Sequence, residues 1–375
     1  MKTALIILLV LTMPLAFCAC GQKKPAFVVD DGTGNGSINN SVTSSENSST
    51  NSEVSSKNES TSSTLTPSTS TSTSSKNETI DLPGLGFDPN QIIVACWGDS
   101  VTEGMGMHSK SYPTKLQALL GDKYKVFNGG DGGEKTVTIA ARQGAYKVYT
   151  TSKITFYKNE DSIIIGTESR DAFVTKDGKS VVLTSLLGNG ISVNTVKING
   201  EEFTLDFQGS FVWSPRSFKL YLQRMGDSAA PLVIPAGSEV VFANTDLSTK
   251  GGVDIYMMGA NGGYKDNAEY KEQLKAMIKH HGNDKYLIVQ PYWTAVDLSE
   301  FGDHVVYFEK LAVEKGLAFE GITPTEADKS ACSAGKLPPS FRYENSATDV
   351  HLSQYGYDFL AHCIYEQGKT LGYFK

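Results

Sequence analysis

A short apolar run in this chain ends in a small polar turn. Residues 92–96 are all apolar, and Gly98, Asp99 and Ser100 follow the run closely. A continuous apolar run bounded by a turn is typical of a strand that is buried on both faces. Open sheets built from such strands place their sites at the carboxyl ends of the strands. The sequence therefore predicts an α/β sheet with the Ser100 hydroxyl at its edge.

Strand-like and helix-like segments alternate on both sides of a long interruption. The predicted strands are 91–96, 124–127, 253–258, 286–289 and 317–319. The predicted helices are 112–120, 136–143, 267–281, 304–315 and 355–368. This alternation favours a parallel sheet covered by helices.

The interruption, residues 147–246, has a different pattern. Short alternating runs such as 203–207, 218–222 and 239–242 are separated by turn residues such as Asp177-Gly178 and Asn199-Gly200. Regularly spaced short strands with such turns are typical of a β-sandwich or barrel. We therefore expect an all-β lobe inserted into the α/β domain, and we call residues 147–246 the β lobe.

One histidine near the C-terminus could activate Ser100. The chain has only six histidines, and His351 lies in the compact segment 349–353. A serine nucleophile needs a base, usually a histidine oriented by a third group. Acyl transfer also needs donors aimed at the developing oxyanion. The glycine-rich loop 128–134 and Asn261 both follow predicted strands and could supply a backbone N–H and an amide.

These four blocks resemble those of the SGNH hydrolases, also called GDSL-type esterases. The resemblance rests on residues 98–104, 128–134, 259–261 and 349–353. It implies a flavodoxin-like parallel sheet sandwiched by helices, with residues 81–146 and 247–375 as the hydrolase domain. It implies neither a metal nor a cofactor.

The resemblance also assigns roles to single residues. Ser100 would be the nucleophile and His351 the base. Gly133, by its position in the loop, and Asn261 would stabilise the oxyanion together with the Ser100 N–H. The family usually has Asp after the asparagine of this block, whereas this chain has Gly262.

The third member of the predicted triad is less regular. The family usually places its Asp three residues before the histidine, where this chain has Thr348. Asp349 lies two residues before His351, a spacing similar to that of some SGNH-like proteins that handle acetyl groups on polysaccharides. We expect Asp349 to orient His351, and the alternative is a backbone carbonyl.

The first 20 residues are typical of a targeting segment. Lys2 precedes an apolar stretch of about 14 residues, which suits a signal peptide better than a membrane span. Its end resembles a bacterial lipoprotein signal, with Cys20 after Ala19 as the lipidated residue in preference to Cys18, which directly follows the bulky Phe17. The alternative is an ordinary signal peptide cut near Ala19. The lipoprotein interpretation predicts an exported protein anchored to the bacterial membrane through Cys20.

A polar tether follows, at residues 21–80. Between residues 41 and 80, 29 of 40 residues are Ser, Thr or Asn. Such a segment cannot bury enough apolar surface to offset its chain entropy, so we expect it to be disordered. The net charge of −7 argues against nucleic acid as a partner.

Several other residues have two interpretations. An exported location permits a Cys332–Cys363 disulfide, although sequence cannot show the geometry. Trp293 follows a strand and is expected to shape the mouth of a pocket.

His280 and His281 end a helix, and no clustered carboxylates or cysteines at ligand spacing suggest a metal. Four aromatic residues of the β lobe could form either a sugar-stacking platform or core: Phe211, Trp213, Phe218 and Tyr221.

The sequence therefore predicts an exported serine esterase. The expected substrate is an acetylated carbohydrate polymer, because export, a long tether and an inserted lobe suit a polymer in the cell envelope. A lipase or acyltransferase of the same superfamily is an alternative. A different alternative is a glycan-binding protein on a degenerate esterase scaffold, although Ser100, Gly133, Asn261 and His351 are all retained.

Overall fold

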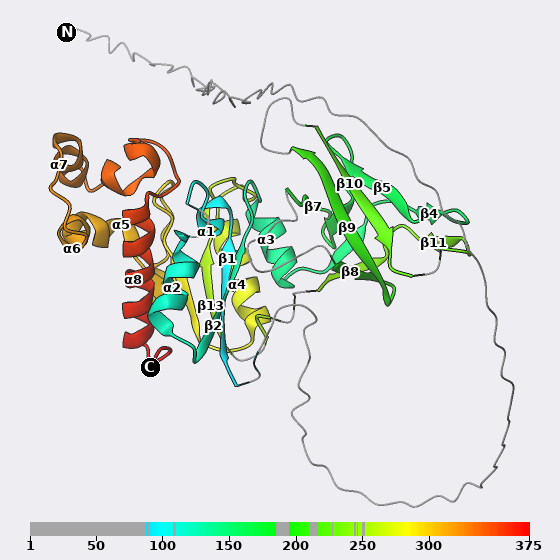
Figure 1. Cartoon of the computed structure of the whole chain (residues 1–375), viewed down its shortest axis with the longest axis horizontal. Helices are drawn as coiled ribbons and strands as arrows, with labels where there is room; N and C mark the ends of the chain where they lie inside the picture. The colour runs from blue at the N-terminus through cyan, green and yellow to red at the C-terminus, as the bar shows by residue number, and fades with distance from the viewer. Residues whose placement is uncertain are drawn as a thin grey trace, which may run out of the picture. The chain divides into compact units, whose positions relative to one another are not determined.

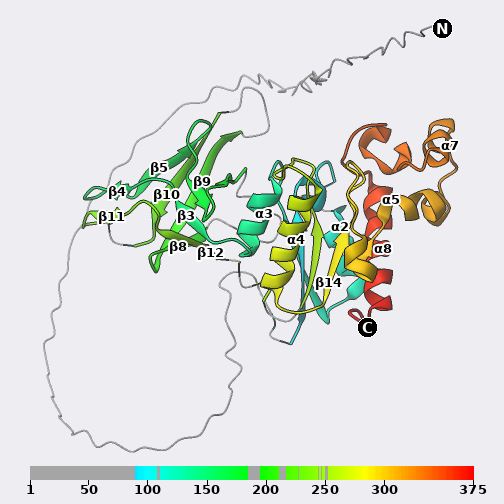
Figure 2. The same ribbon diagram turned by 180° about the vertical axis from the view of Figure 1, so that it is seen from behind.

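The computed structural model describes residues 88, 90–107, 110–184, 195–210, 217–226, 228–243, 245, 247–249 and 252–375. These residues form a parallel sheet with helices and a separate antiparallel sheet (Figures 1 and 2). The predictions for residues 1–80, including Cys20, and for Phe211 and Trp213 lie outside the described residues. No helix among the described residues is long and apolar enough to cross a membrane.

Five parallel strands form the first sheet. In spatial order they are β15 (Val305–Val306), β14 (Tyr286–Val289), β13 (Val253–Met257), β1 (Ile92–Gly98) and β2 (Tyr124–Gly130). Ala95 of β1 lies opposite Asp254 on one side and Phe127 on the other. Numbered along the chain, the order is 2-1-3-4-5, as in flavodoxin-like sheets. Because all five strands are parallel, the loops after them meet at one edge.

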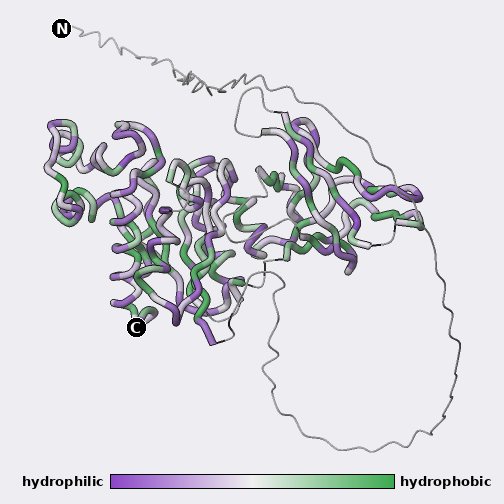
Figure 3. Tube along the Cα trace, in the orientation of Figure 1, coloured by the Kyte–Doolittle hydropathy of each residue, from purple (hydrophilic) through white to green (hydrophobic). Residues whose placement is uncertain are grey.

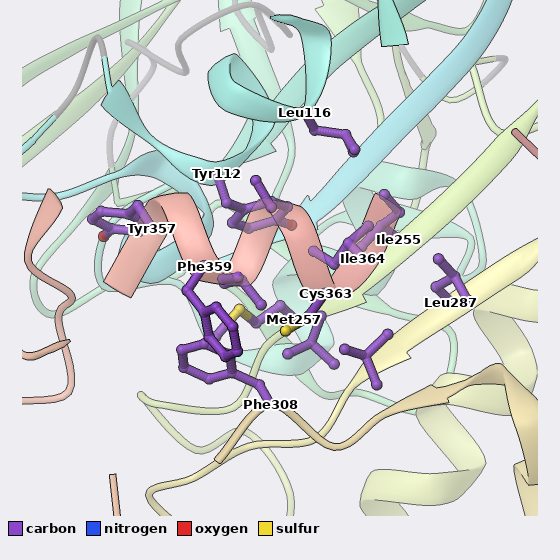
Figure 4. Close-up of a cluster of buried hydrophobic side chains, with 14 of the residues drawn as sticks. Tyr112, Leu116, Ile255, Met257, Leu287, Phe308, Tyr357, Phe359, Cys363 and Ile364 are labelled. Carbon is purple, nitrogen blue, oxygen red and sulfur yellow. The ribbon is translucent and has the colours of Figure 1, made fainter. Parts of the chain in front are cut away.

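Helices cover both faces of this sheet, because alternate residues of β1 point to opposite sides. Val94 and Cys96 pack in a buried cluster with α2 (Tyr112–Leu120) and α8 (Gln354–Thr370). Figure 4 shows side chains of α8 in this cluster, including Phe359 and Ile364. Ala95 and Trp97 pack on the other face with α3 (Thr136–Gln143) and α4 (Asn267–His281). The sheet is therefore buried on both sides, as the apolar run predicts.

The segment after β14 differs from the prediction. The fifth strand is β15, and the predicted strand at residues 317–319 is wrong. Those residues form α6 (Leu317–Phe319), which continues α5 (Phe308–Leu311) and the π-helical turn η3 (Ala312–Gly316). Three apolar residues are too few to distinguish the helical period of 3.6 from the strand period of two, so tertiary packing decides which structure they adopt. Phe319 lies against Phe359 of α8, with ring centroids 5.4 Å apart.

Short elements complete this part of the chain. They are α1 (Ser100–Glu103), α7 (Glu326–Ser333) and the 3₁₀ turns η2 (Ser299–His304), η4 (Pro339–Phe341) and η5 (Tyr343–Asn345). Cys332 on α7 and Cys363 on α8 are free thiols, as is Cys96. The disulfide that export would permit is thus not formed between these two helices.

The β lobe contains the antiparallel strands. In spatial order the larger sheet consists of β5 (Ser162–Thr167), β10 (Ser217–Arg224), β9 (Glu201–Ser210), β8 (Thr195–Ile198), β12 (Glu239–Phe242), β3 (Val148–Thr150), β6 (Phe173–Thr175) and β7 (Ser180–Val181). A smaller sheet pairs β4 (Ile154–Phe156) with β11 (Leu232–Ile234).

Burial alternates along the strands of the β lobe. In β10, Phe218, Leu220 and Leu222 are buried, whereas Ser217 and Lys219 are exposed. The hydropathy along the tube in Figure 3 is correspondingly mixed in this lobe. One face of the sheet therefore covers a core, and the other faces water. Phe218 stacks on Phe207 with centroids 5.2 Å apart, which agrees with the core interpretation of this aromatic residue.

Candidate active site

The turn after β1 holds Ser100 at the carboxyl edge of the parallel sheet. Ser100 begins α1 and is buried, with 5% of the residue exposed. Gly98 leaves no room for another residue, because a Cβ there would overlap Thr102 Oγ1 and the carbonyl oxygen of Met257. The small residue Gly98 therefore allows α1 to follow β1 directly, in close contact with the end of β13.

Asp99 supports this turn. Its Oδ1 accepts from the Val101 N–H at 3.1 Å, and its Oδ2 accepts from the Ala260 N–H at 3.0 Å. The carboxyl group thus joins the loop after β1 to the loop after β13. Burial raises the pKa of Asp99 to about 6, although the two backbone hydrogen bonds and nearby His351 act in the opposite direction.

Ser100, His351 and Asp349 form a continuous hydrogen-bonded chain. His351 Nε2 lies 2.9 Å from Ser100 Oγ, and His351 Nδ1 lies 2.7 Å from Asp349 Oδ1. With the Nδ1 proton donated to Asp349, Nε2 presents a lone pair to the serine hydroxyl. This is the geometry of a nucleophile, a base and an orienting carboxylate. Between the two orienting groups considered from sequence, the structure places the Asp349 carboxylate at the ring.

The loop that holds Asp349 and His351 is fixed from two directions. Arg342 Nη1 donates to the Asp349 carbonyl oxygen at 2.6 Å, and the Tyr292 hydroxyl donates to the Val350 carbonyl oxygen. The Arg342 guanidinium also lies over the Tyr292 ring, 5.3 Å from its centroid. Sequence analysis missed both supporting residues, since neither stands in a motif.

The glycine-rich loop after β2 forms a tight turn beside Ser100. The Glu134 N–H donates to the Asp131 carbonyl oxygen at 3.3 Å, so Gly132 and Gly133 are the two central residues. Gly133 has a φ of +82°, which favours glycine. A Cβ added to Gly132 would lie 3.7 Å from Ser100 Cβ. Gly132 therefore lies next to the serine.

Asn261 lies at the same loop. Its Nδ2 donates to the Glu134 carbonyl oxygen at 3.1 Å, and the Thr136 N–H donates to the Gly262 carbonyl oxygen at 3.0 Å. The loops after β2 and β13 are thus bonded together. All five residues predicted for the site, Ser100, Gly133, Asn261, Asp349 and His351, lie at the carboxyl edge of the sheet or on the loop that reaches it.

A buried ion pair supports the glycine-rich loop from below. Arg142 Nε donates to Glu134 Oε2 at 2.7 Å, and Arg142 Nη2 donates to the Gly129 carbonyl oxygen at 2.8 Å. The two side chains are 2% and 0% exposed. Sequence analysis did not single out this pair, although their spacing of eight residues across a predicted loop and helix was visible.

A cavity of about 520 Å³ opens at the same sheet edge, after β14 and β15. Tyr292, Trp293 and Tyr307 line it, together with charged side chains of α5 and η3. Trp293 therefore shapes a pocket, as its position after a strand predicts. Through Tyr292, one wall of this cavity is bonded to the loop that holds His351.

The described residues contain no group of three or more His, Cys, Asp or Glu side chains placed to hold a metal ion. His281 instead bonds to backbone, with Nε2 3.0 Å from the Lys285 carbonyl oxygen.

Comparisons with known proteins add little to this geometry. No family model and no curated protein matches the chain. A solved structure described as "a putative lipolytic protein of G-D-S-L family from Desulfitobacterium hafniense DCB-2" is similar at 11% identity with a TM-score of 0.33. The match covers 73% of this chain and 99% of that one. At this level of similarity, the neighbour supports no argument about function.

Proposed function

We propose that this protein is a serine ester hydrolase. The observation that supports the proposal is the hydrogen-bonded chain from Ser100 through His351 to Asp349, at 2.9 and 2.7 Å. Ser100 and His351 are 251 residues apart in the sequence, so local sequence does not account for their contact. An aligned serine, histidine and carboxylate is the arrangement that acyl transfer needs.

Each residue has a defined step. Ser100 Oγ attacks the acyl carbon while His351 Nε2 takes the hydroxyl proton. Asp349 stabilises the resulting imidazolium. The Gly133 N–H, the Asn261 amide and the Ser100 N–H stabilise the oxyanion. His351 then returns the proton to the leaving alcohol, and a water molecule, activated by the same base, releases the acid.

The order of the site blocks supports an SGNH-type hydrolase. Ser100 follows β1, Gly133 follows β2, Asn261 follows β13, and His351 precedes α8. The 2-1-3-4-5 strand order brings the first three loops side by side, because β1 lies between β2 and β13. This family assignment rests on the motifs and their placement, and on no comparison.

The substrate that we propose is an acetylated carbohydrate polymer. Aromatic and charged side chains together line the cavity beside the His351 loop, and sugars present both apolar faces and hydroxyl groups to such a lining. β14 lies two strands from β1, about 10 Å at the usual strand spacing. A polymer held at Ser100 could therefore place a neighbouring sugar in the cavity.

The proposed location is the cell surface. The apolar stretch before Cys20 and the Ser-, Thr- and Asn-rich segment after it support a lipid anchor with a long tether. A tethered enzyme of this kind would reach insoluble polymers that cannot diffuse to it. This part of the proposal rests on sequence alone.

The proposal is tested with esters of different acyl length. The mature chain is assayed on p-nitrophenyl acetate, butyrate and octanoate, and then for acetate release from acetylated xylan, mannan and peptidoglycan. Cleavage confined to acetyl esters is expected. Ser100→Ala should abolish cleavage without changing the melting temperature, whereas the exposed Ser330→Ala should cleave normally.

Other outcomes contradict parts of the proposal. Preference for octanoate would replace the carbohydrate substrate with a lipid. Activity that persists in Ser100→Ala would refute the nucleophile. Complete absence of cleavage, together with no labelling by a serine-reactive phosphonate, would refute the hydrolase and favour a binding protein.

A further inference from the structure

A threonine of the β lobe reaches the glycine-rich loop of the hydrolase domain. Thr184 follows β7, and its Oγ1 donates to the Gly132 carbonyl oxygen at 2.6 Å. The side chain is buried, with 5% exposed. Next to it, Leu183 packs in the core of the β lobe. The hydroxyl is therefore held in place by the lobe, although its partner belongs to the other part of the chain.

The carbonyl that Thr184 binds belongs to the peptide that joins Gly132 to Gly133. A peptide unit is planar and trans, so its C=O and N–H point in opposite directions. Fixing the direction of the Gly132 carbonyl therefore fixes the direction of the Gly133 N–H. This N–H is the backbone donor that the proposed mechanism aims at the oxyanion.

The backbone of the turn permits two orientations of this peptide. Residues 131–134 form a turn with Gly133 at the third position and φ +82°, which are the features of a type II turn. A type I turn differs mainly by a rotation of the central peptide. With glycine at both central positions, neither conformation is disfavoured by a side chain. An external contact must select one.

We propose that Thr184 is a positioning residue that holds the Gly132–Gly133 peptide with its N–H toward the oxyanion. This inference rests on the proposed ester hydrolysis and adds a role for the inserted β lobe. Without the hydroxyl, the peptide would rotate and direct a carbonyl oxygen at the developing negative charge. A hydrogen bond at the carbonyl also polarises the N–H of the same peptide and makes it a better donor.

The test compares Thr184→Val with Thr184→Ser in the mature chain on p-nitrophenyl acetate. Thr184→Val keeps the shape and loses the hydroxyl. It should lower kcat about 10- to 100-fold, which does not exceed the effect of removing one oxyanion donor, about 10²- to 10³-fold. KM should change little, because the oxyanion forms only in the transition state. Thr184→Ser keeps the donor and should retain kcat within about threefold of the wild type.

A second buried threonine serves as the control. Thr138 on α3 accepts from the Val182 N–H at 3.2 Å, so it also joins the β lobe to the hydrolase domain, but this bond goes to Val182 and not to the Gly132–Gly133 peptide. Thr138→Val should keep kcat within about twofold. The pH profile of kcat/KM should be unchanged in Thr184→Val, because His351 and Asp349 are untouched.

The outcomes separate this inference from the proposed function. Wild-type kcat in Thr184→Val, with Ser100→Ala inactive, would overturn the role of Thr184 and leave the hydrolase intact. An equal loss of kcat in Thr138→Val and Thr184→Val would also overturn it, since a general loosening of the lobe would then suffice. Absence of Ser100-dependent cleavage in the wild type would overturn both.

Discussion

At the scale of a residue, the hydrogen bonds of Asp349 determine the orientation of His351. Its Oδ1 accepts from both the backbone N–H and the Nδ1–H of His351, at 2.8 and 2.7 Å. Because Asp349 lies two residues before His351, its carboxylate can bond to both the backbone and the imidazole ring of His351. The Asp349 side chain is 31% exposed, so the pair is not isolated from water.

Replacing this carboxylate with an amide tests its role. Asp349→Asn should lower kcat by about 10² to 10⁴, because an amide favours the wrong histidine tautomer and cannot stabilise imidazolium. The measurement is kcat on p-nitrophenyl acetate between pH 6 and 9. Glu344→Gln, in the same loop, should behave as the wild type. A loss smaller than about tenfold would favour a backbone carbonyl as the orienting group.

Glu320 offers a test of pH dependence away from the site. Burial raises the pKa of Glu320 to about 7, nearby Asp358 adds to the rise, and Lys115 opposes it. Since this pKa exceeds that of the unfolded chain, the folded protein loses stability as pH rises from about 4.5 to 7. The ionised carboxylate is therefore the unfavourable form.

Glu320→Gln removes that ionisation. At pH 8 the variant should exceed the wild type in free energy of unfolding by about 1–2 kcal/mol, after discounting for partial exposure to water. At pH 4, below the ordinary pKa of a glutamate, the two proteins should be nearly equal. Urea denaturation at both pH values measures the difference. A variant that is equally stable at pH 8 would show that water screens this carboxylate fully.

At the scale of elements, α3 and the glycine-rich loop depend on one buried ion pair. Arg142→Met leaves Glu134 buried without its partner, which should cost about 3–5 kcal/mol of unfolding free energy. The double variant Glu134→Met with Arg142→Met should recover most of that loss, because no charge then remains buried. Urea denaturation measures both, and a double variant as unstable as the single one would contradict this account.

Patterns of period two and period 3.6 predicted the longer elements well. The buried run of β1 and the alternation in β10 are visible in sequence, because six or more residues suffice to define a period. Most errors fall on elements of two or three residues, but the eight-residue helix α7 was also not predicted. Residues 305–306 were predicted as helix but form β15, and residues 317–319 were predicted as strand but form α6. The strands β3, β6 and β11 were not predicted, since their boundaries are set by pairing partners far away in the chain.

At the scale of the whole molecule, we propose that a lipid on Cys20 attaches the chain to the membrane. Cys20→Ala should move the protein from the membrane fraction to the soluble exported fraction, because the lipid would have no attachment point. Cys18→Ala should remain in the membrane. Fractionation with an antibody to the chain measures both. Retention of Cys20→Ala in the membrane would refute lipidation at Cys20.

The sequence by itself determined the residues of the candidate site, because the types and order of the four blocks are local properties of the chain. It also determined the existence of a parallel sheet and an antiparallel lobe, since their periodicities differ. The tertiary structure decided what supports the site. The contacts of Thr184 with Gly132 and of Tyr292 with Val350 join segments that no local pattern relates. Such pairings depend on which loops the folded sheet brings to one edge, and that arrangement exists only after packing.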